Sequence, residues 1–163
     1  MPKSPQPSGL ANRRVVALAY DGLCTFEFGV AVELFGLPRP EMGPDWYRFA
    51  TAAIEPGPLR GLGGVQVMAD GGLELVEQAG TIIAPGWRGA RAPVPQPLID
   101  ALQVAHRRGA RVMSICSGVF VLAAAGLLAG RRATTHWRYV DTLRALYPDI
   151  EVQPDVLLSL IHI

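Results

Sequence analysis

Cysteine is scarce in this sequence, and its scarcity limits how the fold can be stabilised. Only Cys24 and Cys116 occur among 163 residues. Two cysteines cannot build the disulfide framework of a small secreted domain, and their spacing is not that of a paired zinc motif. A chain of this length buries roughly 70% of its unfolded surface in one core, so the fold needs neither disulfides nor a metal site to be stable. We therefore expect one domain with reduced thiols, located in the cytoplasm, without a metal or other cofactor.

An excess of one charge and long apolar stretches are also missing. Fifteen basic and 14 acidic side chains leave a net charge of +1, which does not favour a polyanion-binding surface. The arginine pairs at 107–108 and 131–132 are typical of exposed helix ends or turns. The longest apolar run, 119–128, is about half the roughly 20 residues of a membrane-spanning helix. The start of the chain lacks the apolar core of a secretory signal, so no membrane partner is indicated.

What the sequence does contain is an alternation of short apolar runs and amphipathic segments. Half of the residues are hydrophobic and 18% are charged, as in folded globular chains. Apolar runs that end at turn residues predict buried strands, whereas helical spacing with Pro or Gly boundaries predicts helices. The predicted strands are 15–19, 46–53, 81–84 and 111–115, with local pairing at 65–68, and the predicted helices are 25–35, 97–108, 117–128 and 137–146. This alternation predicts an α/β sandwich around a mostly parallel sheet.

The most informative segment is Ser114-Ile115-Cys116-Ser117-Gly118, where a predicted strand meets a predicted helix. Such a turn strains the backbone of its central residue and needs small residues two positions to either side, which Ser114 and Gly118 supply. It places the Cys116 sulfur at a helix N-terminus, where amide groups and the helix dipole stabilise a thiolate. It also lies at the carboxyl end of the sheet, where open α/β folds collect their sites. The alternative is that Cys116 packs as a small buried apolar side chain.

Three other residues could converge on Cys116. Gly86 follows a predicted strand, so its amide could act as an oxyanion donor. Glu27 lies in the first turn of a predicted helix, where its carboxyl could hydrogen-bond the thiol, and His136 could orient or deprotonate the sulfur. Each also has an ordinary structural explanation, as a turn glycine, a dipole-facing acid and a hydrogen-bonded histidine. Cys24 has no comparable setting, and we expect it to be structural.

Four motifs, in this order, resemble the DJ-1/PfpI superfamily: YDGLCTFEFGVAVELFG after the first strand, the APG turn, SICSG, and AAAGLLAGRRATTHW. The resemblance covers residues 14 to 155 and implies the flavodoxin-like, three-layer fold of class I glutamine amidotransferase-like domains. The stretches 19–41 and 114–139 are most similar to the amidase-like N-terminal domain of AraC-family transcriptional regulators of the FtrA type.

The resemblance also implies roles for individual residues. Cys116 corresponds to the nucleophile-elbow cysteine, Glu27 to the acidic residue that contacts it, Gly86 to the oxyanion-type glycine, and His136 to the histidine of the TTH segment. Ser117 stands where PfpI-type peptidases carry a histidine, so a peptidase dyad is not supported. Isonitrile hydratases share the TTHW segment but typically have Asp at the position of Glu27 and Thr at that of Ser117.

The function implied is that of a regulatory sensor domain. Its crevice around Cys116 would bind a small effector, or the thiol would sense oxidants or electrophiles. A homodimer is implied, and DNA would be bound only through a C-terminal helix-turn-helix region that this chain does not contain. One alternative is a stand-alone enzyme with a nucleophilic Cys116, isonitrile hydratase-like or glyoxalase- or amidase-like. Another is a domain that keeps the fold without chemistry.

The resemblance also predicts the domain boundaries. We expect a flexible leader over residues 1–13 and the DJ-1/PfpI-like domain over 14–155. Residues 156–163 are expected to be an atypical tail from a truncated or wrongly joined reading frame, because their apolar sequence departs from the family's usual polar course. A domain incomplete at its C-terminus would leave apolar surface uncovered, so it should be less stable than the complete domain and prone to associate.

Overall fold

Four parallel strands form the central sheet of the computed structural model, which describes residues 12–154. The strand order is β2-β1-β5-β6, with bounds Arg48–Ala53, Arg14–Ala19, Thr81–Pro85 and Arg111–Ile115. The chain first places β2 on one side of β1 and then β5 on the other, so the order reverses between β1 and β5. In parallel sheets, the carboxyl edge at such a reversal is where ligands commonly bind. The predicted α/β class with a mostly parallel sheet is confirmed.

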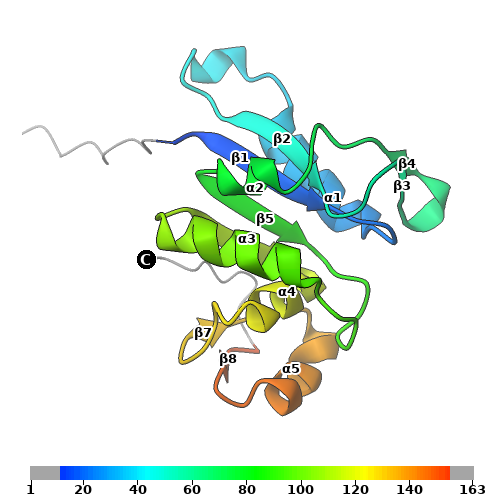
Figure 1. Ribbon diagram of the computed structural model, residues 1–163, viewed down its shortest axis with the longest axis vertical. Coiled ribbons are helices and arrows are strands. Elements are labelled where there is room, and N and C mark those ends of the chain that lie inside the picture. Colours follow the sequence, from blue (N-terminus) through cyan, green and yellow to red (C-terminus); the bar gives the residue numbers. More distant parts are fainter. Residues whose placement is uncertain (1–11, 155–163) are drawn as a thin grey trace, which may run out of the picture.

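Helices cover both faces of this sheet (Figure 1). In that view α2 and α3 lie in front of the strands, whereas α1 lies behind them. Helix α4 follows β6 and packs on β5 and β6. The helices span Thr25–Ala31 (α1), Glu74–Glu77 (α2), Gln96–Arg107 (α3), Val119–Ala124 (α4) and Val140–Leu146 (α5). Two small ladders complete the fold: antiparallel β3 (Leu59–Arg60) with β4 (Gln66–Val67), and parallel β7 (Arg132–Ala133) with β8 (Glu151–Val152).

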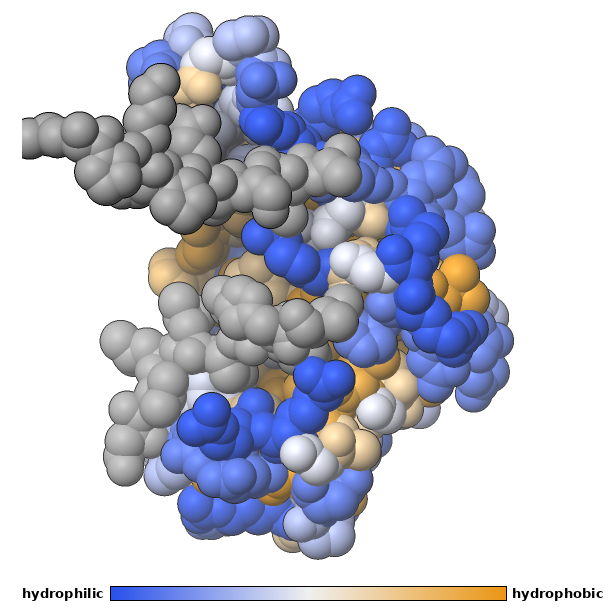
Figure 2. Space-filling view, turned by 90° about the vertical axis from the view of Figure 1, so that its left-hand side faces the viewer, coloured by the Kyte–Doolittle hydropathy of each residue, from blue (hydrophilic) through white to orange (hydrophobic). Residues whose placement is uncertain are grey.

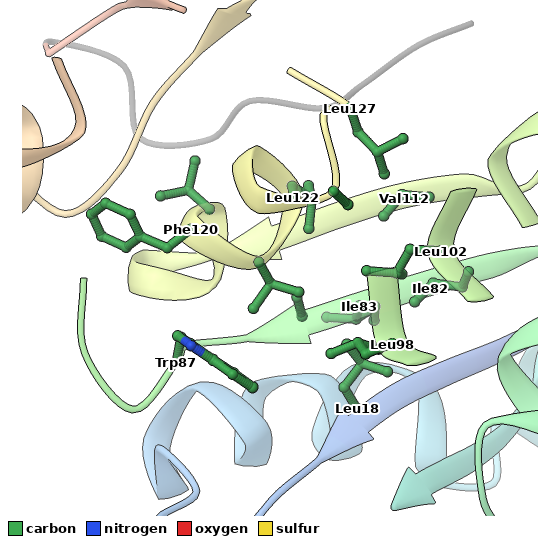
Figure 3. Close-up of a cluster of buried hydrophobic side chains, with 14 of the residues drawn as sticks. Leu18, Ile82, Ile83, Trp87, Leu98, Leu102, Val112, Phe120, Leu122 and Leu127 are labelled. Carbon is green, nitrogen blue, oxygen red and sulfur yellow. The ribbon is translucent and has the colours of Figure 1, made fainter. Parts of the chain in front are cut away.

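The core lies between the sheet and its helices. Residues 15–19 of β1 are each at most 1% exposed, as expected for a strand that is covered on both faces. Figure 3 shows Leu98 and Leu102 of α3 beside Ile82 and Ile83 of β5, within one buried cluster. The uninterrupted apolar runs of the sequence are therefore the strands that hold the carboxyl-edge loops in place.

Several elements differ in extent from the prediction. The first predicted helix is confirmed, although it continues beyond Ala31 as a π-helical turn, Val32–Gly36. The helix predicted over 117–128 is shorter, because α4 ends at Ala124 and Gly126 has a φ of 72°. Helix α2 and strands β3, β7 and β8 were not predicted, since segments this short show no periodicity. The predicted tail 156–163 and nearly all of the leader lie outside the described residues.

The surface is mainly hydrophilic in the view of Figure 2, where hydrophobic residues show chiefly in the hollow between the upper and lower parts. Across residues 12–154, none of the helices combines the length and the apolar character that crossing a bilayer requires.

Candidate functional site

Cys116 occupies the strained turn that the sequence predicts. Strand β6 ends at Ile115, and a 3₁₀ turn, Cys116–Gly118, leads into α4. Cys116 has a φ of 56° and is the one non-glycine residue with positive φ in the described part of the chain. A left-handed conformation costs a non-glycine residue about 1–2 kcal/mol, and such strain concentrates at functional sites. The surrounding contacts must therefore hold this turn in place.

Gly118 makes one of those contacts possible, because without a side chain it allows the turn to approach the end of β5 closely. A Cβ atom built on Gly118 would lie 2.0 Å from the carbonyl oxygen of Ala84 and 3.1 Å from the amide nitrogen of Gly86. Real side chains do not tolerate such distances, so any residue with a Cβ would push the turn away from the end of β5. The requirement for a small residue at this position is met as predicted.

The environment of the Cys116 sulfur keeps it protonated. Burial, and after it a hydrogen bond with the Glu27 side chain, raise the pKa of the thiol from its ordinary value of 9.0 to about 11. The backbone amide of Ser117 lowers the pKa but is outweighed. Thiolate stabilisation at the helix N-terminus, which the sequence led us to expect, is therefore not what this structure shows. Glu27 does lie against Cys116, as expected.

Cys24 and Tyr20 belong to the same cluster. The Cys24 thiol donates to the carbonyl oxygen of Trp87 over 3.7 Å, and its charge state influences the pKa of Cys116. The buried Tyr20 hydroxyl donates to the carbonyl oxygen of Pro85 at 2.9 Å. Burial, followed by a hydrogen bond with Cys24, raises the pKa of Tyr20 far above its ordinary value. The sequence did not single out Tyr20 and led us to expect a structural role for Cys24, although both lie directly after the first strand, in YDGLC.

Ser117 ties the turn to the loop that follows β5. Its hydroxyl, in a residue only 3% exposed, accepts a hydrogen bond from the Trp87 amide at 2.9 Å and donates to the Trp87 carbonyl at 3.3 Å. The Trp87 indole in turn donates to the carbonyl of Ala92 at 3.1 Å. Both hydrogen-bonding functions of Ser117 are thus used within the fold, and the residue positions the loop.

The amide of Gly86 is also used within the fold. Its N–H donates to the carbonyl oxygen of Ile115 at 3.0 Å, so the expected oxyanion donor is not free in this structure. Gly86 has a φ of 74°, and a Cβ atom built there would lie 2.6 Å from the Cys24 sulfur. The glycine is needed because the chain turns and Cys24 packs against it.

The TTH segment reaches the turn through Thr135. The Thr135 hydroxyl donates to the carbonyl oxygen of Cys116 at 2.9 Å, a contact that sequence reasoning did not anticipate. His136 accepts a hydrogen bond from the Arg138 amide at Nδ1, over 3.2 Å. Its ring lies 5.3 Å from that of Trp137 and 6.1 Å from that of Tyr139. These contacts of His136 are all on its own turn, and none places its ring on the thiol.

The residues that the fold brings together form a hydrogen-bonded cluster at the point where the strand order reverses. Tyr20 and Cys24 follow β1, Trp87 follows β5, and Cys116 follows β6. Within residues 12–154, no three His, Cys, Asp or Glu side chains cluster as metal ligands would. A neutral thiol and a carboxyl side by side can recognise polar groups of a small molecule.

Comparison with known proteins agrees with this arrangement. An uncharacterised protein in the cpoL 5' region of Streptomyces lividans is 36% identical over 137 residues, which is 83% of this chain and 95% of that protein. The HTH-type transcriptional regulator CdhR of Pseudomonas aeruginosa is 34% identical over 113 residues, 69% of this chain but only 33% of the regulator. The crystal structure of an AraC family transcriptional regulator from Pseudomonas putida has the same fold, with a TM-score of 0.71 at 18% identity over 89% of this chain and 79% of that one. A model of the DJ-1/PfpI family matches residues 13–155, and the chain therefore belongs to the DJ-1/PfpI family.

Proposed function

We propose that this chain is the sensor domain of an AraC-family transcriptional regulator and binds a small effector in the crevice around Cys116. The observation that carries the proposal is the partly buried Cys116 thiol beside the Glu27 side chain, an environment that raises the pKa of the thiol to about 11. The thiolate is the nucleophilic and peroxide-reactive form of cysteine, so a neutral thiol favours recognition over reaction. The match to one third of CdhR supports a role as one domain of a longer regulator.

The gene itself provides the test. We expect the reading frame to continue beyond the codon for Ile163 into a helix-turn-helix DNA-binding region, as long-read sequencing would show. A stop codon directly after Ile163 would overturn the regulator assignment, because DNA binding is assigned to that region and not to the nearly neutral domain described here.

A stand-alone enzyme is the second candidate, and the Streptomyces relative favours it. That protein is matched over 95% of its length, so a chain of about this size exists among the relatives. Strain at Cys116 also suits a reactive position. The purified chain would then hydrate an isonitrile such as cyclohexyl isocyanide to the formamide, with loss of turnover in Cys116→Ala. Equal background rates for both proteins would remove this candidate.

We also propose that the chain forms a homodimer through the outer face of α1. Phe28 and Ala31 of α1 face the core, while Phe26 of α1 and Leu34 of the π-helical turn that follows are 79% and 52% exposed. Exposed apolar side chains that gather on one face mark an interaction surface. The outer face holds a groove of about 390 Å³ beside Phe26 and Gly29, and a Cβ atom built on Gly29 meets nothing within 4 Å.

A second copy of this chain fits the groove, because the protruding Phe26 ring and the groove lie on the same face of the molecule. Two-fold symmetry, the commonest in homo-oligomers, then lets Phe26 of each copy enter the groove beside Gly29 of the other. We expect sedimentation equilibrium to show a dimer that Phe26→Asp converts to a monomer. The matched control is Met68→Asp, at a residue that is 72% exposed on another surface, and it should leave the dimer intact. A monomeric parent protein, or equal effects of both variants, would contradict this interface.

A further inference from the structure

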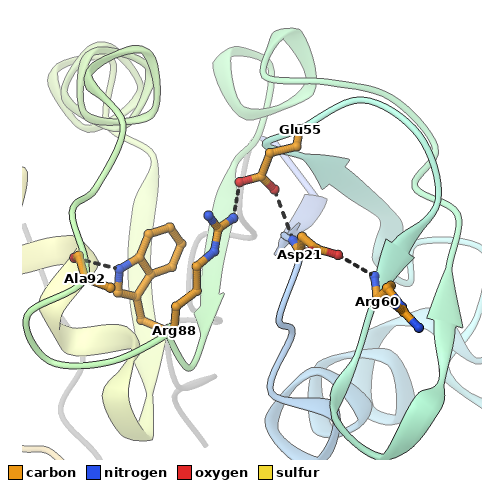
Figure 4. Close-up of polar contacts among 6 residues, drawn as sticks. Asp21, Glu55, Arg60, Arg88 and Ala92 are labelled. Atoms are coloured by element: carbon orange, nitrogen blue, oxygen red, sulfur yellow. Dashed lines mark hydrogen bonds and ion pairs between the residues drawn. The ribbon is translucent and has the colours of Figure 1, made fainter.

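An ion pair at the carboxyl edge of the sheet bridges loops on opposite sides of β1. Arg88 follows β5 and Glu55 follows β2, and Nη2 of the arginine pairs with Oε1 of the glutamate. The second oxygen of Glu55 accepts the amide of Asp21 at 3.0 Å, and an oxygen of Asp21 accepts the amide of Arg60 at 3.0 Å. Figure 4 shows this chain of contacts across the carboxyl edge of the sheet.

Two buried rings lie beneath the Arg88 guanidinium. Its central carbon lies 5.0 Å from the centre of the Trp87 ring and 5.4 Å from that of the Tyr20 ring. These rings are themselves in contact, with centroids 4.9 Å apart, and both residues are at most 3% exposed. Cation–π attraction therefore holds the guanidinium at this place, and its N–H donors can still bind a carboxylate.

Most of that donor edge is not used by Glu55. A guanidinium has five N–H donors in a planar fork that matches a carboxylate with two parallel hydrogen bonds. The described pair joins one nitrogen to one oxygen, and both side chains are 31% exposed. A partly exposed, single-contact ion pair contributes little to stability. Glu55 can thus be exchanged for another carboxylate at small cost.

The position of Arg88 connects this exchange to the cysteine. Arg88 directly follows Trp87, whose backbone is held by both hydrogen bonds of Ser117 and contacts the Cys24 thiol. A ligand bound to the Arg88 fork would therefore rest on the loop that is tied to the Cys116 turn. The acidic residues on the same edge, Asp21 and Glu27, disfavour a multiply charged anion such as a phosphate.

We propose that Arg88 anchors a carboxylate group of the effector, and that Glu55 occupies this anchor when the effector is absent. This assignment rests on the proposed effector-binding function and gives the effector a chemical class, a small molecule with a single carboxylate. Binding releases Glu55 from Arg88, so the link between the loops after β2 and β5 opens when the ligand arrives.

The test uses butyrate as the probe and butyramide as its neutral counterpart. The ¹⁵N-labelled chain is titrated with each at constant ionic strength, and the Arg88 Nε–H signal and the Asp21 amide signal are followed by NMR. We expect saturable shifts with butyrate and none with butyramide. Saturation by both probes, or by neither, overturns the carboxylate anchor.

Substitutions on either side of the ion pair should act in opposite directions. Arg88→Gln should abolish the saturable shift of the Asp21 amide, whereas Glu55→Gln should tighten butyrate binding several-fold because it removes the internal competitor. Arg91→Gln, in the same loop, is the matched control and should bind like the parent. If Arg88→Gln fails to fold, Glu55→Gln decides, since weaker or equal binding in that variant overturns the proposal.

Failure here can be told apart from failure of the proposed function. A reading frame that stops after Ile163 would remove the regulator assignment while leaving the titration result in place.

Discussion

At the scale of single residues, opposing effects meet on the Cys116 sulfur. The Ser117 amide favours a thiolate, whereas burial and the adjacent Glu27 favour the thiol, and the latter two prevail. A position at a helix N-terminus therefore does not by itself make a cysteine reactive, because desolvation and a neighbouring carboxyl can exceed the effect of one amide.

This balance predicts how alkylation of Cys116 depends on pH. With a pKa of about 11 in place of 9.0, the thiolate fraction at pH 7 is about 100-fold lower than that of an ordinary cysteine. In a Cys24→Ser background, the rate with iodoacetamide should keep rising between pH 9 and 11, where an ordinary thiol levels off. Glu27→Gln should increase the neutral-pH rate, because it removes a group that raises the pKa. A profile that levels off below pH 9 would contradict this assignment.

Gly118 provides a second test at this scale. Gly118→Ala should destabilise the protein by about 1–3 kcal/mol or more, because the new Cβ atom overpacks the end of β5. The matched control is Gly29→Ala, since a Cβ atom there meets nothing within 4 Å. A helical alanine should stabilise the monomer by about 0.5–1 kcal/mol relative to glycine. Urea unfolding of both variants at low protein concentration measures the difference, and equal midpoints would show that the turn can relax.

Part of the site could be predicted from local sequence and part could not. The strained Cys116 and the small Gly118 follow from a five-residue pattern, because a tight turn imposes its demands on immediate neighbours. The contact of Thr135 with the Cys116 carbonyl, and that of Cys24 with Trp87, join segments distant in sequence. No periodicity records such contacts, and the engaged amide of Gly86 was missed for the same reason.

At the scale of elements, the Ser117 hydroxyl binds both backbone groups of Trp87 in the loop after β5. Ser117→Ala should cost about 1–3 kcal/mol, because the buried amide of Trp87 loses its partner and the carbonyl keeps only the long contact with the Cys24 thiol. Hydrogen exchange should then increase at Trp87, whereas exchange in α3 should change only in proportion to the global stability. Unchanged protection at Trp87 would mean that the loop is held by its other contacts, among them the indole bond to Ala92.

Long elements were predictable, and short ones were not. β1 and β5 are continuous apolar runs, and α3 has a clear apolar stripe with proline at its start and Gly109 directly after its C-terminal turn. The π-helical turn after α1 and the early end of α4 depend on packing and on the positive φ of Gly126. Helical spacing continues across both points in the sequence, so the pattern alone extends α4 too far.

At the scale of the whole molecule, the reversal of strand order between β1 and β5 decides which residues meet. The three loops that follow β1, β5 and β6 contribute the tyrosine, tryptophan and cysteine of one cluster at the carboxyl edge of the sheet. Their chemistry is local, but their proximity is a property of the topology, which the alternation of strands and helices predicted only as a class. The same topology buries two acids of high pKa, Tyr20 and Cys116, in one region.

These two groups make global stability depend on alkaline pH. Each has a pKa above its ordinary value when folded, so the folded state retains protons that the unfolded state releases. Linkage then requires the free energy of unfolding to fall as pH rises. For Cys116 this fall begins near pH 9 and is complete near pH 11, the ordinary and folded pKa values. Urea unfolding from pH 8 to 11 should show it, and Cys116→Ser should reduce the slope while Tyr20 keeps part of it. Parallel stability curves for the two proteins would show that Cys116 ionises equally in both states.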